Sequence, residues 1–370
     1  MTDTQDGSRE PLRLGIVGCG HWARDAYLPN LVDCAQVTVT ALCDRDESRA
    51  AALADGFAEG GSPRATVHSD YRRMFDSESM DLVLVSTLAH VRPEITITAL
   101  EAGVHVLAAK PMALSLADGE RMLEAAAAAG RILLVGYNYR FRDDARVVHQ
   151  FVRDGGIGEP RYARAWVHAP GVPSYAPHYV NSLSGGGALA STGIHPLDLA
   201  VWLMGCPPLL SAEGQAHSRF TGLGPLPPDL EAIRDEYETD DLVSGYVRFA
   251  DGLTLTTESS WMAPGPIQGS GVEVWGTKGY ASIGPLRLLS WGDGDYVDRT
   301  EEIAPGLASS FKDTEVRLQR ELMHFIDCVL GREEPLIVPR EMWTVQAILE
   351  GLYGGRRDYD PANVPAFARG

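Results

Sequence analysis

The chain has 370 residues, of which 45% are hydrophobic and 22% charged, as expected for a globular protein long enough for two domains. Its 32 basic and 50 acidic residues give a net charge of −18, which disfavours nucleic-acid phosphates and anionic membrane surfaces as partners. The sequence shows no apolar run of membrane-span length and no secretory leader, and its five cysteines lack metal-ligand spacing. We therefore expect a cytoplasmic protein without a metal, nucleic-acid or membrane partner, with residues 1–10 disordered.

The first predicted element is a buried strand that runs into a glycine-rich turn and then a helix, within Leu12 to Leu31. The turn fits the pattern G-x-G-x-x-G/A, with Gly18, Gly20 and Ala23 at the small positions. Gly18 permits the tight turn, and Gly20 lets a pyrophosphate approach the backbone. The motif predicts a dinucleotide site only weakly by itself, because glycine turns between strands and helices are common.

A second strand, Val37 to Leu42, leads to Asp44, which lies 24 residues after Gly20. At about this spacing an acidic side chain can hydrogen-bond the adenosine ribose diol of a bound dinucleotide. The alternative is that Asp44 caps the helix that follows. A carboxylate here favours NAD because it repels a 2′-phosphate, whereas the adjacent Arg45 leaves NADP open.

Helices and strands then alternate up to Gly136. The predicted helices are Asp46–Glu59, Ser69–Phe75, Pro93–Ala102 and Ser115–Gly130, and the predicted strands are Asp81–Val85, Val104–Ala109 and Arg131–Gly136. This alternation predicts an α/β fold whose residues 11–136 form a doubly wound parallel sheet of the Rossmann type. Lys110 follows a strand, so topology places it at the ligand-binding edge of that sheet, although a strand-end lysine is often only a solvated charge.

Beyond Gly156 the pattern changes to longer, alternating strands. They are predicted at Arg161–His168, Leu209–Ser218, Asp241–Phe249, Leu253–Met262, Gly271–Thr277 and Tyr280–Trp291. Residues 137–370 are thus expected to form an α+β domain with a large, open, mostly antiparallel sheet, and the C-terminal segment is expected to pack back on the first domain. Helices Thr192–Gly205 and Thr314–Leu330 are candidates to cover one face, which leaves the other for a subunit interface.

His195 stands at the amino end of the first of these helices, because Pro196 fits the first helical position and Gly205 the C-terminal cap. The helix dipole would keep the imidazole neutral there, able to accept a proton from a hydroxyl. The alternative is that His195 merely caps the helix. Asp198 falls in the first turn, where carboxylates are favoured anyway, so a structural role is expected for it.

Three segments occur in one order: the glycine turn, Ala109-Lys110-Pro111, and the stretch from the glycine triplet at 185–187 to His195. On these segments the chain resembles the Gfo/Idh/MocA oxidoreductase family from about Leu12 to the last helix. The resemblance implies an N-terminal Rossmann domain with NAD or NADP and an open-sheet C-terminal domain that forms homodimers or homotetramers. It also implies a small sugar-like substrate, such as a sugar, cyclitol or nucleotide sugar or its keto form.

The resemblance implies roles for individual residues as well. Lys110 and His195 are the catalytic candidates: His195 would move the hydroxyl proton, and Lys110 would stabilise the alkoxide during hydride transfer. The candidate cofactor-binding residues are Gly18, Gly20, His21, Trp22, Asp44, Arg45, Ser86, Thr87, His90, Lys110 and Pro111. The candidate substrate-binding residues are Asn138, Arg140, His178, Tyr179, Ser191 and Thr192.

The sequence departs from the family pattern in its polar residues. Ala109 stands where the family usually has Glu, Ser191 where it usually has Asp, and Ala89 and Arg92 where Asn and a second His are frequent. The loss of two carboxylates changes the polarity of the expected pocket, although Ser191 can still hydrogen-bond a hydroxyl. Three alternatives to a polyol dehydrogenase therefore stay open: a keto-sugar reductase, a redox-silent regulatory protein, and an NAD-dependent glycoside hydrolase.

Overall fold

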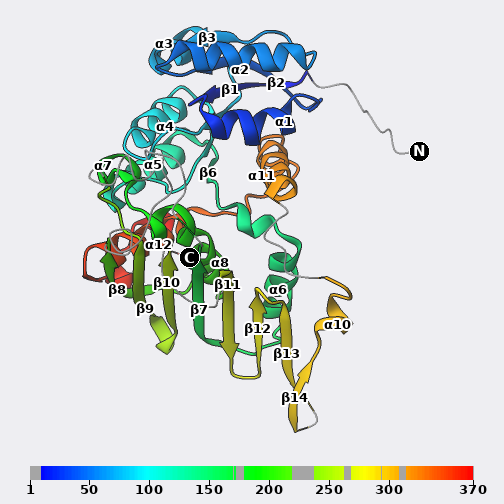
Figure 1. The fold of residues 1–370 in the computed structure, drawn as a ribbon, viewed down its shortest axis with the longest axis vertical. Helices are drawn as coiled ribbons and strands as arrows, with labels where there is room; N and C mark the ends of the chain where they lie inside the picture. Colours follow the sequence, from blue (N-terminus) through cyan, green and yellow to red (C-terminus); the bar gives the residue numbers. More distant parts are fainter. Residues whose placement is uncertain are drawn as a thin grey trace.

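A computed structural model describes residues 10–169, 171, 179–218, 237–261, 268–292, 294–307 and 314–369. The described residues form two sheets, one in the upper and one in the lower half of the molecule as seen in Figure 1. Residues 1–10 were expected to be disordered, and residues 1–9 of this segment lie outside the described residues. A search of the described helices for one long and apolar enough to span a membrane finds none.

The upper sheet is parallel and has the strand order β3-β2-β1-β4-β5-β6, as the sequence predicts. Its strands are β1 (Leu12–Val17), β2 (Val37–Cys43), β3 (Thr66–His68), β4 (Leu82–Val85), β5 (His105–Ala108) and β6 (Leu133–Val135). Because helices cover both faces, the central strands are apolar throughout: all four residues of β4 are buried. The strand order reverses between β1 and β4, which makes their carboxyl ends the expected place for a ligand.

The helices of this half are η1 (Ala23–Tyr27), α1 (Leu28–Leu31), α2 (Glu47–Glu59), α3 (Tyr71–Ser77), α4 (Arg92–Glu101) and α5 (Leu116–Ala129). Side chains cap several of them: Asp46 accepts from the Ser48 amide at the start of α2, and Ser115 accepts from the Asp118 amide at the start of α5. The helix after the glycine turn begins as a π-helical turn, η1, and continues as α1 with Pro29 in its first turn.

The lower sheet has the order β14-β13-β12-β11-β7-β10-β9-β8-β15 within the described residues. Its strands are β7 (Pro160–His168), β8 (Leu209–His217), β9 (Leu242–Phe249), β10 (Thr254–Ser260), β11 (Gly269–Gly276), β12 (Gly279–Ile283), β13 (Arg287–Gly292), β14 (Asp295–Asp298) and β15 (Arg356–Asp358). The sheet is antiparallel as predicted, except that β7 and β10 pair in parallel. The segment predicted as one strand, Tyr280–Trp291, is two strands, because Gly284 takes a left-handed φ of 74° and turns the chain.

Helices cover one face of this sheet. The helical segments of this half are η2 (Asn138–Phe141), α6 (Asp143–Arg153), α7 (Asn181–Ser184), η4 (Leu189–Gly193), α8 (Ile194–Leu203), α10 (Thr300–Ile303), α11 (Thr314–Val329) and α12 (Pro339–Tyr353). Helix α8 packs on β7 and β11, α12 on β8 and β9, and α6 on β12. The expectation that α11 also covers the sheet is wrong, because α11 packs instead on η2 and on α1 of the upper half (Figure 1).

A buried ion pair joins three of these segments. Arg140 of η2 donates from Nε to Oδ2 of Asp198 in α8 at 3.0 Å, and it also donates to Glu341 of α12. The side chains of Arg140 and Asp198 are both fully buried. Because each charge is removed from water, each depends on the other for compensation. This pair therefore holds η2 and α8, the two segments that carry the candidate site residues Asn138 and His195, in one arrangement.

We predict that Asp198→Asn destabilises the protein by about 3 kcal/mol, because it leaves a buried guanidinium with one carboxylate instead of two. Urea denaturation followed by circular dichroism measures this change. The matched control is Asp81→Asn, which breaks an ion pair with Arg13 on the surface and should leave the denaturation midpoint nearly unchanged. A loss below about 1 kcal/mol for Asp198→Asn would mean that Glu341 alone compensates Arg140.

Candidate active site

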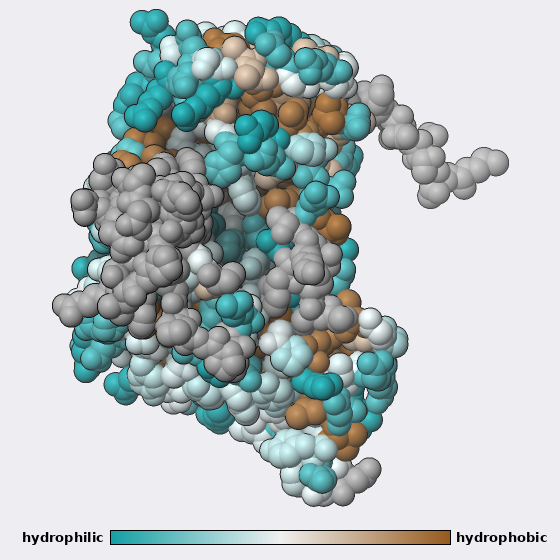
Figure 2. All heavy atoms as spheres, viewed as in Figure 1, coloured by the Kyte–Doolittle hydropathy of each residue, from teal (hydrophilic) through white to brown (hydrophobic). Residues whose placement is uncertain are grey.

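Two adjoining cavities lie at the carboxyl edge of the parallel sheet. One has a volume of about 630 Å³ and is lined by the glycine turn, Asp44 and residues that follow β3 and β4. The other, of about 390 Å³, lies between the two halves of the molecule, and Figure 2 shows a recess between these halves. Gly20, Ser86, Thr87 and Leu88 line both cavities, so one elongated ligand can occupy the two together.

The glycine turn is shaped for a close approach. Gly18 has a φ of 94°, and a Cβ added to it would lie 2.9 Å from the carbonyl carbon of Ser86, so only glycine fits. A Cβ on Gly20 would have no atom within 4 Å, which means that this backbone faces open cavity. The turn thus offers exposed backbone at the start of a helix, the kind of surface that accepts a pyrophosphate.

Asp44 lies at the far end of the larger cavity. Its Oδ2 accepts from the Cys19 amide at 2.9 Å and its Oδ1 from the Asp46 amide at 3.0 Å. The cap of the following helix is Asp46, so Asp44 is not needed for that structural role. Its carboxylate is held against the glycine turn, with lone pairs left for a ribose diol.

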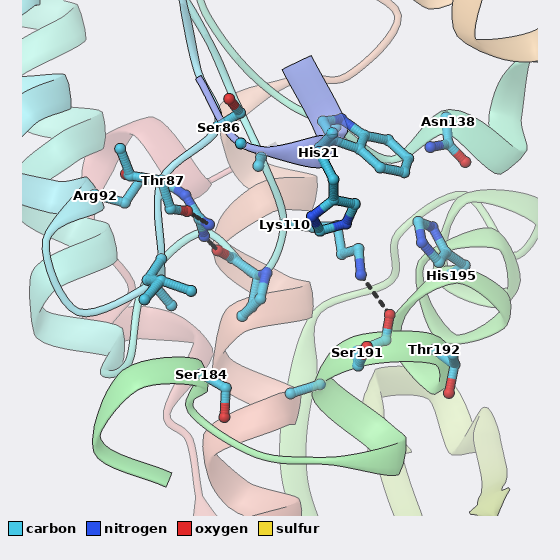
Figure 3. Close-up of a pocket in the computed structure, with 18 of the residues that line it drawn as sticks. His21, Ser86, Thr87, Arg92, Lys110, Asn138, Ser184, Ser191, Thr192 and His195 are labelled. Carbon is cyan, nitrogen blue, oxygen red and sulfur yellow. Dashed lines mark hydrogen bonds between the residues drawn. The ribbon is translucent and has the colours of Figure 1, made fainter. Parts of the chain in front are cut away.

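Lys110 joins the two halves of the site. It follows β5, and its Nζ donates to the backbone carbonyl of Ser191 in η4, as the dashed line in Figure 3 shows. Burial and the nearby Arg92 lower the pKa of Lys110 to about 8. The ammonium is therefore still mostly charged at neutral pH, in a cavity that excludes much of the water that would screen it.

His195 faces the same cavity from the opposite side (Figure 3). Its ring stacks on Tyr139, with centroids 4.6 Å apart, and the guanidinium carbon of Arg317 lies 4.8 Å from the centroid of the same tyrosine ring. Burial, Lys110 and Arg317 lower the pKa of His195 well below its ordinary value, so the imidazole is neutral at pH 7. Its Nδ1 is buried without a hydrogen-bond partner in the described part of the chain.

The neutral imidazole has a different cause from the one expected from the sequence. The helical run does not begin at His195, because the π-helical turn η4 precedes α8 and extends the run back to Leu189. His195 is thus inside the run, where the helix dipole is weaker. Burial and two cations, rather than the dipole, keep the ring neutral.

Most of the predicted site residues do meet at these cavities. Those that line the smaller cavity are Gly20, His21, Trp22, Ser86, Thr87, Lys110, Pro111, Asn138, Ser191, Thr192 and His195. Those that line the larger one are Gly18, Gly20, Asp44, Arg45, Ser86, Thr87 and His90. The hydroxyl of Thr192 is already engaged, because it donates to the Ala188 carbonyl and accepts from the indole of Trp261.

Three predicted substrate-binding residues have other outcomes. Arg140 lines neither cavity, because its guanidinium is paired with the carboxylates of Asp198 and Glu341. Tyr179 is 1% exposed and packs with Trp261, so it belongs to a small core cluster. We therefore withdraw both as substrate contacts. His178 lies outside the described residues.

Sequence reasoning missed Arg317 and Glu321 of the smaller cavity and gave Arg92 no role in it. Arg92 is buried and donates to the carbonyls of Thr87 and Pro111, so it ties the loop after β4 to the Lys110 segment. Arg317 and Glu321 project from α11, one helical turn apart. The sequence did contain a signal for Glu321. It is a carboxylate on an otherwise apolar helix stripe, among Leu318, Leu322 and Phe325.

Two family models match the chain. Residues 12–137 match the model of an oxidoreductase family with an NAD-binding Rossmann fold, and residues 145–282 match that of the GFO/IDH/MocA C-terminal domain. The chain belongs to the Gfo/Idh/MocA oxidoreductase family. Its residues 12–137 are accordingly the family's NAD-binding domain.

Individual relatives match the whole or part of the chain. D-glucoside 3-dehydrogenase of Escherichia coli K12 is 27% identical over 346 residues, covering 93% of this chain and 95% of the relative. Myo-inositol 2-dehydrogenase of Thermotoga maritima is 30% identical over 194 residues, covering 52% of this chain and 55% of the relative. A structure of levoglucosan dehydrogenase with NADH and levoglucosan is similar in fold, with a TM-score of 0.75 and 20% identity over 95% of this chain and all of the other.

The cavities of this family member fit the dinucleotide that its Rossmann domain implies. Gly20 leaves room at the turn, Asp44 faces the adenosine end, and the polar atoms Thr87 Oγ1, Asn138 Oδ1 and His195 Nδ1 at the other end are buried without described partners. Such atoms are costly unless a ligand satisfies them. Within the described ranges, no group of three or more His, Cys, Asp or Glu side chains could hold a metal ion.

We predict that Asp44→Asn weakens NADH binding about tenfold, because it exchanges a charged hydrogen-bond acceptor at the ribose diol for a neutral one. NADPH binding should weaken less or improve, since the repulsion of a 2′-phosphate is removed and Arg45 and Arg49 remain beside it. Fluorescence titration with both nucleotides measures this. Equal losses for NADH and NADPH would contradict the assigned contact, and Asp55→Asn on the surface of α2 is the control.

Proposed function

We propose that this protein is an NAD-dependent oxidoreductase that interconverts a hydroxyl and a ketone on a sugar or cyclitol. The observation that carries the proposal is the meeting of Lys110 and His195 across the smaller cavity, next to the Thr87 and Gly20 backbone. Relatives named as glucoside, inositol and levoglucosan dehydrogenases support this substrate class. NAD, when bound, supplies the hydride acceptor or donor, and Gly18, Gly20 and Asp44 would hold its adenosine diphosphate portion.

Different side chains of the cavity transfer the proton and stabilise the negative charge. His195, neutral and with an unpartnered Nδ1, accepts the proton of the substrate hydroxyl during oxidation and returns it during reduction. The Lys110 ammonium stabilises the negative charge that develops on the same oxygen. Ser191 also lines the cavity and is the proposed contact to another substrate hydroxyl.

Lys110→Met and His195→Gln should each lower kcat/KM about 10²- to 10⁴-fold, because each removes one partner of the reacting oxygen. NADH affinity should change less than about threefold in either variant, so titration separates chemistry from cofactor binding.

Turnover of the wild type should also fall as pH rises through about 8, where the lowered pKa of Lys110 makes the ammonium lose its proton. Lys110→Arg should remove this fall, because the guanidinium keeps its charge.

Two surface variants control for the loss of a lysine or a histidine. Lys278→Met lies in the exposed turn between β11 and β12, and His217→Gln lies at the exposed end of β8. Both should retain wild-type turnover. Near-normal turnover in both Lys110→Met and His195→Gln, tested on a panel of sugars, cyclitols and keto-sugars, would overturn the proposal.

We further propose that residues 137–370 supply the substrate side of the site and that two copies of the chain associate through the open face of the lower sheet in a cytoplasmic homo-oligomer. Supporting this, β7 alternates buried residues on the helix-covered face with half-buried ones on the other. The open face carries Trp275, which stacks on Tyr162 and makes a tilted ring contact with Tyr280. All five cysteines are unpaired thiols, as is usual in a reducing compartment.

Trp275→Arg should dissociate the oligomer, because it places a charge in the middle of the proposed apolar interface. Light scattering coupled to size-exclusion chromatography measures the mass. Val338→Arg changes an exposed apolar residue at the start of α12, away from this face, and should leave the mass unchanged. A wild-type protein of about 40 kDa would contradict the proposal.

A further inference from the structure

Glu321 is a buried carboxyl group in a position that the proposed chemistry leaves unused. It lies in the middle of α11 and is 4% exposed, with Leu318, Leu322 and Phe325 on the same buried stripe. Its Oε1 has no hydrogen-bond partner among the described residues, although the side chain lines the smaller cavity. A carboxyl buried in this way is costly unless something in the cavity bonds to it.

The carboxyl of Glu321 lies next to the ends of two strands of the parallel sheet. A Cβ on Gly136, just after β6, would lie 3.7 Å from Glu321 Oε1 and 3.9 Å from the Cα of Ala109, both ordinary contact distances. The carboxyl thus stands beside the carboxyl ends of β5 and β6. Lys110 follows Ala109 directly, so Glu321 is close to the reacting end of the cavity.

Asn138 brings a second unsatisfied acceptor to the same place. Its Oδ1 is buried without a described partner, and its segment η2 packs against α11. In Figure 3 Asn138 lies on the η2 side of the cavity, apart from the Lys110–Ser191 contact. Two orphaned acceptors at one end of a cavity indicate a ligand group that carries more than one N–H or O–H donor.

A primary carboxamide has two N–H donors and one carbonyl acceptor. Burial, together with Asp198, raises the pKa of Glu321 to about 8, while Arg317 on the same helix opposes this rise and Tyr27 packs nearby. At neutral pH most of the carboxyl is therefore protonated and can both accept an N–H and donate to a carbonyl. An acid of this kind pairs with a carboxamide through two hydrogen bonds.

We propose that Glu321 and Asn138 bind the carboxamide of the nicotinamide ring. The inference rests on the proposed NAD-dependent function. Because the carboxamide is attached next to the hydride-carrying carbon, holding it at α11 fixes the rotation of the ring and turns that carbon toward Lys110 and His195. Glu321 is thus a cofactor-binding residue that comes from the far end of the chain.

The test compares ligands that do and do not carry the carboxamide. Glu321→Leu should weaken NADH binding about tenfold and change ADP-ribose binding less than twofold, because ADP-ribose lacks the nicotinamide. Wild-type protein should bind NAD⁺ about tenfold more tightly than 3-acetylpyridine adenine dinucleotide, whose methyl group replaces the amide nitrogen, and Glu321→Leu should reduce this preference to less than twofold. Isothermal titration gives all of these constants without turnover.

Two variants keep the outcome unambiguous. Glu321→Gln retains a group that can accept and donate, so it should keep most of the preference for the carboxamide even if Glu321→Leu fails to fold. Glu315→Leu, on the exposed part of α11, should match wild type throughout. Equal loss of NADH and ADP-ribose binding in Glu321→Leu, or a Glu321→Gln variant without any carboxamide preference, would overturn the assignment. Failure of the wild type to bind either ligand would instead overturn the proposed function.

Discussion

The hydrogen bond from the Lys110 ammonium to the Ser191 carbonyl is the contact on which the rest of the site depends. It links the end of a parallel strand in one half of the molecule to a π-helical turn in the other. Four residues after Ser191, the same helical run presents His195. The two halves therefore have to be docked before the lysine and the histidine can face one oxygen atom, and the buried Arg140–Asp198 pair holds η2 and α8 together within the lower half.

The side chains around the cavity are mostly cationic, whereas the whole chain has a negative net charge. The protein carries a net charge of −18, yet Lys110, Arg92 and Arg317 place three cationic side chains around a cavity with one buried carboxyl. Arg92 has no acidic partner among the described residues and reaches only backbone carbonyls, and burial lowers its pKa to about 10. Burial, together with the cations Lys110 and Arg317, keeps His195 neutral, and the local excess of positive charge favours a negative oxygen in the cavity.

The fold and half of the site could be predicted because they depend on local patterns. Apolar runs between alternating helices predict a parallel sheet, and topology then places Gly18, Asp44 and Lys110 at one edge of it. The confirmed family membership agrees with the order of the three motifs. Helices α6 and α12 were not predicted, and α11 was predicted to cover the wrong sheet. An amphipathic stripe indicates that a helix packs on another element, but it does not identify that element.

The remaining site residues depend on contacts between distant parts of the sequence. Arg140 was expected at the substrate, but Asp198 and Glu341, 58 and 201 residues further along, bind its guanidinium. Glu321 reaches the cavity because α11 returns to the Rossmann half, where it packs on α1. Neither the partner of a charged residue nor the element against which a helix packs can be read from a local pattern.

The central claim is that Lys110 and His195 act on one substrate oxygen, and a crystal structure of the protein with NADH and a bound sugar or cyclitol tests it most directly. We expect Lys110 Nζ and a ring nitrogen of His195 both to lie within hydrogen-bond reach of one substrate oxygen. The carbon that bears this oxygen should face the hydride-carrying carbon of the nicotinamide. A substrate oxygen held by other side chains, with neither Lys110 nor His195 in reach, would contradict it.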